Sequence, residues 1–418
     1  MERIVVQGGR RLAGSVRVSG SKNATLALMA GALLADGESR LRNVPRLRDV
    51  DAMAQILDAL GARVAWSPDD PHTLAIDPRG VHNPEAPYDL VRKMRASFMV
   101  LGPLVARFGV ARVSEPGGCA IGVRPVDQHL KGLAALGAKV RLEHGIVEAS
   151  AARLTGGRFS FDLVTVNGTQ NVMMAACLAA GESVLENCAR EPEVVELAQF
   201  LSRMGAEISG AGSDRIVVRG VERLRPVALD VCGDRIEAGT LLAAGAITGG
   251  ELELTGVDPS HLEATVEKLR AAGCEIDLAY DRLRLRGAEL RGVDAVTAPF
   301  PGFPTDMQAQ LMAVVTKAVG SSVITETVFE NRFMHVPELI RLGADIRLSG
   351  RAAHVRGVRR LSGAPVMATD LRASASLLIA ALAAEGETVV NRVYHIDRGY
   401  ERIEAKLASL GAAIRREV

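Results

Sequence analysis

A short glycine-rich stretch, residues 115–129 (EPGGCAIGVRPVDQH), places a cysteine close to an arginine. Glycines on both sides of Cys119 leave it without the side chains that usually cover a core cysteine, and Arg124 follows five residues later. An accessible thiol near a cation ionises more readily, and the thiolate is the nucleophilic form. The stretch therefore predicts a reactive thiol at Cys119. A lone cysteine is also commonly an inert core residue, which we expect of Cys177 and Cys274.

A second group of candidates stands where apolar helical segments begin. Six polar residues occupy the same place, fourteen positions before a glycine that ends each segment: Asn23, Arg95, Asn167, Arg235, Asp306 and Arg372. Asparagine and aspartate are good helix N-caps, so capping alone is one interpretation of three of them.

The arginines in this group need a different explanation, because a cation at a helix N-terminus opposes the helix dipole by up to about 1 kcal/mol. An anion held between the cation and the free N–H groups reverses this penalty. We therefore predict an anion-binding cleft. Ion pairing with the nearby carboxylates of Asp89, Asp234 and Asp370 is the alternative.

Charged loops add further cations. Lys22 follows a Ser/Gly turn in SGSKNA, Arg332 lies in FENRFMHVPE, and Arg398 precedes Gly399 in IDRGYERIE. None of these is the GxxxxGK[ST] phosphate loop, and no GxGxxG follows a predicted strand, so we expect no dinucleotide cofactor. For the single histidines His129 and His335 we expect a surface or hydrogen-bonded structural role.

The elements that position these residues repeat along the chain. LGARV, LGAKV, MGAEI, AGCEI, LGADI and LGAAI place glycines at 61, 137, 205, 273, 343 and 411, with spacings of 76, 68, 68, 70 and 68. Each glycine ends a helical pattern and precedes a short apolar strand, as a glycine C-cap does. The glycines at 37, 109, 181, 249, 320 and 386 also precede alternating strand patterns, least clearly the one at 109.

Six α/β units are too many for one core, so we predict two domains of three units each. Their apolar segments are apolar on all sides, which is typical of helices buried inside a shell of sheets.

The composition of the chain argues against several classes of protein. The formal net charge of +1 gives no general reason to bind nucleic acid or to insert into a membrane. Five cysteines without a CxxC pair argue against a disulfide framework and a zinc site and fit a reducing compartment. The N-terminus has no apolar signal segment, so we expect a cytoplasmic protein.

Several of these stretches together resemble one family. They are SGSKNA, YDLVRKMRAS, PGGCAIGVRPVD, CGDRIEAGT, FPTDMQAQ, ITETVFENRFMHVPEL, ATDLRASAS and YHIDRGYERIE. The chain is similar from Arg3 to its C-terminus to the bacterial UDP-N-acetylglucosamine enolpyruvyl transferases. The related enolpyruvyl transferases that act on shikimate 3-phosphate share the six-unit fold but lack the cysteine loop, so that activity is the alternative.

The resemblance implies a two-domain inside-out α/β barrel with three units per domain and a catalytic cleft between the domains. One domain would span residues 21–233, and residues 1–20 with 234–418 would form the other. The implied reaction transfers the enolpyruvyl group of phosphoenolpyruvate to the 3-hydroxyl of UDP-N-acetylglucosamine and releases phosphate. It is the first committed step of peptidoglycan synthesis, needed for cell-wall biogenesis, cell shape and division, and the target of fosfomycin. No metal or organic cofactor is implied, and both partners are small-molecule substrates.

The resemblance also assigns residues. The catalytic ones are Cys119, Lys22, Asp306 and Arg398. The substrate-binding ones are Lys22, Asn23, Arg95, Arg124, Pro125, Val126, Asp127, Gln128, Asp306, Val328, Arg332, Arg372 and Arg398.

Their implied roles follow the charges of the substrates. Lys22, Arg124 and Arg398 would hold phosphoenolpyruvate, with Arg332 and Arg372 near its carboxylate. Asn23, Arg95 and residues 124–128 would meet the nucleotide, and Val328 the sugar. Cys119 would protonate the methylene carbon and form a covalent adduct, and Asp306 would be the base.

The chain departs from the family at two positions. Leu163 stands where some members have a lysine, and Met99 where some have a tryptophan. No phosphate contact is therefore expected at residue 163.

Overall fold

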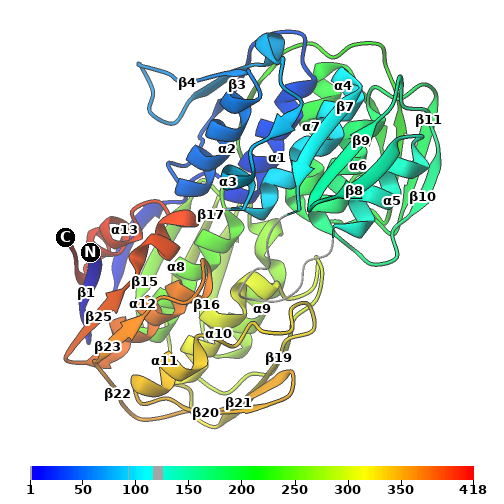
Figure 1. Ribbon diagram of the computed structural model, residues 1–418. Coiled ribbons are helices and arrows are strands. Elements are labelled where there is room, and N and C mark those ends of the chain that lie inside the picture. The colour runs from blue at the N-terminus through cyan, green and yellow to red at the C-terminus, as the bar shows by residue number, and fades with distance from the viewer. Residues whose placement is uncertain (1, 93, 116–125) are drawn as a thin grey trace. The chain divides into compact units, whose positions relative to one another are not determined.

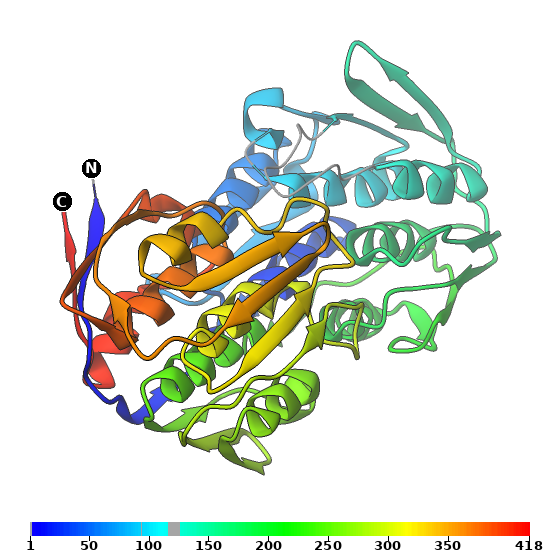
Figure 2. The same ribbon diagram turned by 90° about the horizontal axis from the view of Figure 1, so that it is seen from below.

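A computed structural model describes residues 2–92, 94–115 and 126–418 of the chain (Figures 1 and 2). The described residues form two compact units. The N-terminal unit holds residues 20–115 and 126–232, and the C-terminal unit holds residues 2–19 and 233–418. These limits differ by one residue from those expected from the sequence.

Each unit contains three four-stranded sheets in its described residues. In the N-terminal unit the sheets, in spatial order, are β14 (Ala228–Asp230), β3 (Ser39–Arg42), β5 (Leu74–Asp77) and β4 (Arg63–Trp66); β6 (Glu85–Ala86), β7 (Val110–Ser114), β9 (Ile146–Ser150) and β8 (Lys139–Glu143); and β10 (Arg158–Ser160), β11 (Glu182–Glu186), β13 (Arg215–Arg219) and β12 (Glu207–Ser209). The strand expected only weakly after Gly109 is therefore present as β7.

The C-terminal unit repeats the pattern. Its sheets are β2 (Ala13–Arg17), β15 (Glu251–Thr255), β17 (Arg282–Arg286) and β16 (Glu275–Ala279); β18 (Ala295–Val296), β19 (Ser321–Thr325), β21 (Ala352–Arg356) and β20 (Asp345–Ser349); and β23 (Pro365–Met367), β25 (Glu387–Asn391), β1 (Arg3–Gln7) and β26 (Ala413–Glu417). A small sheet pairs β22 (Leu361–Ser362) with β24 (Ala384–Glu385).

All six larger sheets have the same strand directions, which is the structural form of the sequence repeat. The first two strands of each are parallel, and the remaining pairs are antiparallel. Side chains alternate between a buried and an outer face, as in β15. One face of each sheet therefore covers the core.

Helices fill the interior of each unit. The buried ones are α1 (Lys22–Gly31), α4 (Leu101–Phe108) and α6 (Val166–Ala176) in the N-terminal unit, and α8 (Arg235–Ile247), α10 (Gln308–Val315) and α12 (Ala373–Ala383) in the other. The helices that also have exposed residues are α2 (Arg48–Ala59), α5 (Asp127–Ala135), α7 (Pro192–Met204), α9 (Glu263–Ala271), α11 (Val336–Arg341) and α13 (Ile403–Ser409), with the short α3 (Tyr88–Val91). Helix α10 is buried along its whole length, and α8, α10 and α12 pack on one another.

Helices inside and sheets outside give each unit the inside-out α/β arrangement predicted from the repeats. In the described residues the strands form separate sheets and do not close into one barrel.

Six short 3-10 turns complete the described elements. They are η1 (Ala32–Leu34), η2 (Pro78–Gly80), η3 (Arg95–Val100), η4 (Pro259–Leu262), η5 (Thr305–Met307) and η6 (Val393–Arg398). Three of them, η3, η5 and η6, carry residues predicted to bind substrate.

Strand pairing explains why the first residues belong to the C-terminal unit. Strand β1 lies between β25 and β26, and β2 pairs with β15. Both views place the two chain termini side by side (Figures 1 and 2). Strand β14, the last strand before α8, still belongs to the N-terminal unit, where it pairs with β3.

The recurring glycines end helices as predicted. Gly205 is the C-cap of α7 with φ at 115°, a left-handed conformation that favours glycine because a Cβ would meet the following carbonyl. The equivalent glycines at 61, 137, 273, 343 and 411 also have positive φ.

Candidate active site

A buried charged cluster lies where two interior helices of the C-terminal unit begin. Asp306 sits in η5, directly before α10, and its Oδ1 accepts a bond of 2.6 Å from Arg332 Nη2. Arg332 Nη1 donates to the Thr305 hydroxyl at 2.8 Å. Burial alone would lower the pKa of Arg332, but the carboxylates of Asp306 and Asp370 raise it above its usual value.

Arg372 joins the cluster from the start of α12. Its Nη2 donates to Asp234 Oδ2 at 3.1 Å, and its Nε lies 3.8 Å from Asp306 Oδ2. Asp234 is also the N-cap of α8, where its Oδ1 accepts from the backbone N–H groups of Ile236 and Glu237. The internal ion pair that the sequence left open for these arginines therefore exists for Arg372, and Asp234 raises its pKa against the effect of burial.

Exposure separates the members of the cluster. The side chains of Arg332 and Arg372 are 6% and 2% exposed, whereas that of Asp306 is 27% exposed. The two arginines thus hold one carboxylate that still reaches the surface of the unit. Such a carboxylate can accept a proton from a bound hydroxyl.

Glu326 organises the loop that carries Val328. It is almost fully buried, and its Oε1 accepts from the N–H groups of Val328 and Phe329 at 2.8 and 3.1 Å. Its Oε2 accepts from the Thr305 hydroxyl at 2.7 Å. Val328, half-exposed, is thereby tied to the residue preceding Asp306.

Arg398 ends η6 and is partly buried. The next residue, Gly399, accepts a bond of 2.9 Å on its carbonyl from Arg372 Nη1. Tyr400 follows, with its ring under the Arg372 guanidinium and its hydroxyl 2.9 Å from Thr240 Oγ1. In the C-terminal unit Asp306, Arg332 and Arg372 therefore form one cluster. Val328 and Arg398 are linked to it through backbone groups, by the Glu326 bond to the Val328 N–H and by the Arg372 bond to the carbonyl of Gly399.

In the N-terminal unit Lys22 is the first residue of α1. It is largely buried, and its Nζ lies 3.3 Å from Asp49 Oδ2 in the first turn of α2. The cap of α1 is Ser21, which accepts from the Ala24 N–H, and Asn23 lies inside the helix. Asn167 similarly follows the cap Thr165 of α6. Capping is therefore wrong as the explanation of both asparagines.

Val126, Asp127 and Gln128 begin α5. Val126 is buried at the N-cap position, and Gln128 Nε2 donates to the carboxylates of Asp127 and Asp162, both at 2.8 Å. Gln128 Oε1 accepts from the Asp162 N–H at 2.9 Å. Asp162 thus fixes the start of this helix.

The remaining predicted residues are placed only in part or not at all. Arg95 begins η3, as predicted for a helix start. Cys119, Arg124 and Pro125 lie outside the described residues. Three of the other four thiols differ from the reactive one predicted at Cys119, because burial raises the pKa of Cys177 and Cys188 to about 12 and that of Cys274 to about 11.

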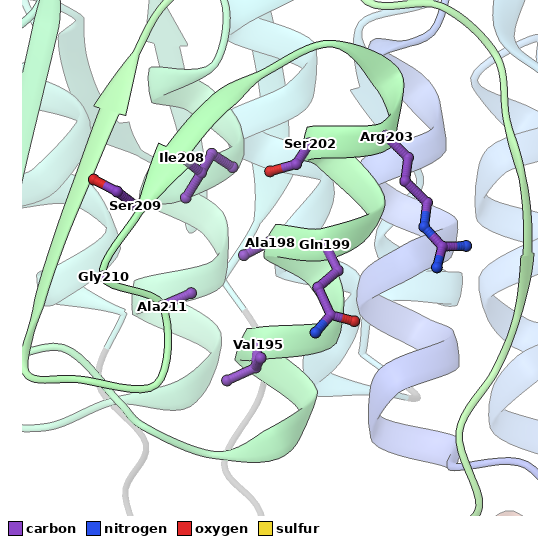
Figure 3. A pocket seen from close by; sticks show the side chains of 9 residues that line it. All are labelled: Val195, Ala198, Gln199, Ser202, Arg203, Ile208, Ser209, Gly210 and Ala211. Atoms are coloured by element: carbon purple, nitrogen blue, oxygen red, sulfur yellow. The ribbon is translucent and has the colours of Figure 1, made fainter.

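A surface pocket lies elsewhere on the N-terminal unit, between α7 and β12, from Val195 to Ala211 (Figure 3). Arg203 is the only charged residue among those that line it, and none of the predicted residues does. No described group of three or more His, Cys, Asp or Glu side chains is arranged to hold a metal ion. Within the described ranges, no helix has the length and apolarity needed to cross a membrane.

Comparison with known proteins identifies the family. The family model described as EPSP synthase (3-phosphoshikimate 1-carboxyvinyltransferase) matches residues 6–407. The chain is 61% identical to the UDP-N-acetylglucosamine 1-carboxyvinyltransferase of Anaeromyxobacter sp. (strain Fw109-5) and 59% identical to that of Myxococcus xanthus (strain DK1622), over 100% of each chain. The chain belongs to the UDP-N-acetylglucosamine 1-carboxyvinyltransferase family. It is accordingly a transferase.

Solved structures of enolpyruvyl transferases share the fold of this transferase. The enolpyruvyl transferase NikO from Streptomyces tendae matches with a TM-score of 0.89 and 29% identity, covering 99% of this chain and 98% of its own. EPSP synthase from Acinetobacter baumannii matches with a TM-score of 0.77 over 100% of both chains, at 17% identity. At 17% identity, the likeness to EPSP synthase shows only that the two chains share a fold.

Two buried residues near the predicted site, His335 and Glu326, were not predicted from the sequence to lie there. His335 is fully buried rather than at the surface, and neither ring nitrogen has a hydrogen-bond partner among the described residues. Burial lowers its pKa to about 4. Glu326 gave no signal beyond its place in ITETVFENRF, because its side-chain partners, Thr297 and Thr305, come from distant segments. His129 has the predicted structural role, with its Nδ1 2.9 Å from Asn171 Nδ2.

Proposed function

We propose that the protein transfers the enolpyruvyl group of phosphoenolpyruvate to the 3-hydroxyl of UDP-N-acetylglucosamine and releases phosphate. Full-length identity of 59–61% to enzymes named for this activity supports the proposal over the shikimate 3-phosphate alternative. The geometric observation that carries it is Asp306, a partly exposed carboxylate held by two buried arginines.

Asp306 is the proposed general base. Its bonds to Arg332 and its proximity to Arg372 fix its position, while its exposed fraction leaves room for a substrate hydroxyl. Removing the hydroxyl proton generates the nucleophile that attacks C2 of phosphoenolpyruvate. Cys119 is the proposed acid that protonates the methylene carbon, and the same thiol is the proposed site of a covalent adduct. Loss of a proton from the new methyl group and departure of phosphate then complete an addition–elimination.

The anionic groups of phosphoenolpyruvate require cations at fixed positions. We assign its phosphate to Lys22, Arg124 and Arg398, and its carboxylate to the neighbourhood of Arg332 and Arg372. Lys22, Arg332 and Arg372 are each largely buried and bound to a carboxylate, which holds their side chains in place before a ligand arrives.

The nucleotide is assigned to Asn23, Arg95 and the run Arg124, Pro125, Val126, Asp127 and Gln128, and the sugar to the side of Val328. Gln128 is held by its bonds with Asp127 and with Asp162, which supports a fixed rather than a mobile helix start. Residues of both units would thus take part in the reaction.

In the cell, this reaction would supply the first committed step of peptidoglycan synthesis, and so cell-wall biogenesis and division. A cytoplasmic location is supported by the cysteine composition, which fits a reducing compartment.

Phosphate release tests the proposal. The purified protein is given phosphoenolpyruvate with UDP-N-acetylglucosamine or with shikimate 3-phosphate, and inorganic phosphate is measured. We expect release with the nucleotide sugar only. Release with shikimate 3-phosphate alone would support the alternative, and release with neither would refute an enolpyruvyl transfer to these acceptors.

Asp306→Asn then tests the assigned base. The amide retains shape and hydrogen-bonding reach but not basicity, so turnover should fall by about 100-fold or more. The affinity for the nucleotide sugar should stay within a few-fold of that of the unmodified protein. Asp281→Asn, at a 58% exposed aspartate of the same unit, is the control and should retain full turnover. A near-normal rate in Asp306→Asn would remove the base from this position.

A further inference from the structure

The segment that carries Arg398 is bounded by two backbone conformations that side chains other than glycine rarely adopt. Arg392, at the N-cap of η6, has φ at 57°, and Arg402, at the N-cap of α13, has φ at 44°. Left-handed residues of this kind cost about 1–2 kcal/mol each. They persist where surrounding contacts hold the chain in place.

Two arginine side chains supply such contacts on either side of Arg398. The preceding residue, Asp397, receives two bonds from Arg416, with Nη2 to Oδ1 at 2.6 Å and Nη1 to Oδ2 at 3.1 Å. The following residue, Gly399, receives the bond from Arg372 Nη1 on its carbonyl. A Cβ at Gly399 would lie 2.6 Å from Leu371 Cδ2, so the chain is closely packed there as well.

Arg416 is itself held from three directions. It lies in β26, the strand beside β1, and its guanidinium also bonds both oxygens of Glu404 in α13, at 3.1 and 3.2 Å, and Glu2 at 3.0 Å. The side chains of Arg416, Asp397 and Glu404 are 22%, 17% and 11% exposed. Partly buried, two-point bonds between a guanidinium and a carboxylate are among the strongest and most directional side-chain interactions. The C-terminal strand is thus connected through one side chain to the residue before Arg398.

We propose that Arg416 is a positioning residue for Arg398, acting through Asp397. The inference rests on the proposed role of Arg398 with phosphoenolpyruvate. The two-point bond fixes the direction in which η6 ends, and therefore where the Arg398 guanidinium is presented. Without it, the strained segment loses one of the anchors described above and relaxes, and Arg398 must be ordered by the ligand at a cost in affinity. A purely structural role would instead weaken the C-terminal strand without affecting one substrate more than the other.

The first test compares Arg416→Met with Arg415→Met. Methionine keeps the apolar stem but removes the guanidinium. The control residue Arg415 is adjacent in the same strand, 58% exposed, and pairs with Glu387 and Glu417. We expect Arg416→Met to raise KM for phosphoenolpyruvate about tenfold or more, the loss that follows from one misplaced charge-assisted contact. KM for UDP-N-acetylglucosamine should change less than twofold, and Arg415→Met should leave both constants unchanged.

A double-mutant cycle tests the route through Asp397. If Arg416 acts only through this carboxylate, Asp397→Asn and the double variant should show the same increase in KM as Arg416→Met, rather than the product of two increases. Multiplying effects would overturn the proposed route. Arg416→Lys retains the charge without the two-point geometry, and we expect an intermediate KM; it replaces Arg416→Met if that variant fails to fold.

Hydrogen exchange provides a readout that needs no catalysis, so the inference and the proposed function can fail separately. Absence of turnover in the unmodified protein would refute the function alone. We expect exchange of the amides of residues 393–402 to become faster in Arg416→Met and to stay unchanged in Arg415→Met. Unchanged exchange and unchanged KM for phosphoenolpyruvate in folded Arg416→Met would overturn the positioning role. So would equal increases in KM for both substrates.

Discussion

The ion pair between Asp234 and Arg372 offers a clear test of how the C-terminal unit balances buried charge. We consider Asp234→Asn, because asparagine is as good an N-cap as aspartate and retains the oxygen that accepts from the N–H groups of α8. The substitution therefore removes the charge opposite Arg372 and, because the second carboxylate oxygen becomes an NH2 group, also the acceptor of the bond from Arg372 Nη2.

The expected cost follows from burial. The side chains of Arg372 and Asp234 are 2% and 4% exposed, so the guanidinium cannot turn to water when its partner is neutralised. Removing one member of a buried ion pair typically costs 3–5 kcal/mol. Asp306, 3.8 Å away, remains as a second carboxylate, which places the expected cost near the lower limit, at about 3 kcal/mol. For a unit of this size, the melting temperature should fall on the order of 10 °C.

Thermal and urea unfolding followed by circular dichroism measure this cost, and Asp258→Asn is the matched control. Asp258 also caps a helical turn, accepting from the Ser260 N–H at 2.9 Å, but its side chain is 54% exposed. We expect the control to lose less than about 1 kcal/mol. An equal loss in both variants would refute the reasoning, because the buried charge of Asp234 would then contribute no more than the exposed charge of Asp258.

Two further predictions concern His335 and Cys119. The folded pKa of His335, about 4, lies below the usual value of 6.5, so the unfolded chain takes up a proton first as the pH falls. The stability that neutral His335 contributes is complete above pH 6.5 and is lost towards pH 4, by about 2 kcal/mol at pH 5. In His335→Gln, the free energy of unfolding in urea should therefore depend less on pH over this range. His354→Gln, at an exposed position in β21, is the control and should leave the dependence unchanged. At neutral pH, fosfomycin should alkylate Cys119 and spare the other four cysteines. The pKa values of Cys177, Cys188 and Cys274, about 11–12, keep these thiols protonated, and the Cys232 thiol donates to Glu196 Oε2 at 2.8 Å. Peptide mass mapping with Cys119→Ala as control checks this, and adducts on the other cysteines would contradict it.

The repeats made much of the fold predictable. A glycine in the left-handed conformation leaves a local signal, and so does a helix that is apolar on all sides. Gly205 and α10 are examples. The pairing of β14 with β3 and of β2 with β15 left no such signal, since it depends on which distant strand edges meet.

Capping shows the limit of local rules at the helix starts. Asn23 and Asn167 have the residue type of a cap, yet Ser21 and Thr165, two residues earlier, provide it. Capping propensity depends on the backbone at one position, and sequence patterns place helix boundaries only to within a few residues. Both asparagines lie within the first turn of their helices and are partly buried.

The ion pairs of the site could not be predicted from local patterns, because the paired residues are far apart in the sequence. Arg372 pairs with Asp234, 138 residues away, while Asp370, two residues away, accepts from the N–H groups of Arg372 and Ala373 at the start of α12. The alternative interpretations of the helix-start arginines, ion pair or anion site, therefore do not exclude one another. A guanidinium has five N–H donors, and Asp234 uses only part of that capacity in Arg372. Its internal partner holds the side chain at the helix start, which is the position that the proposed binding of an anionic substrate requires.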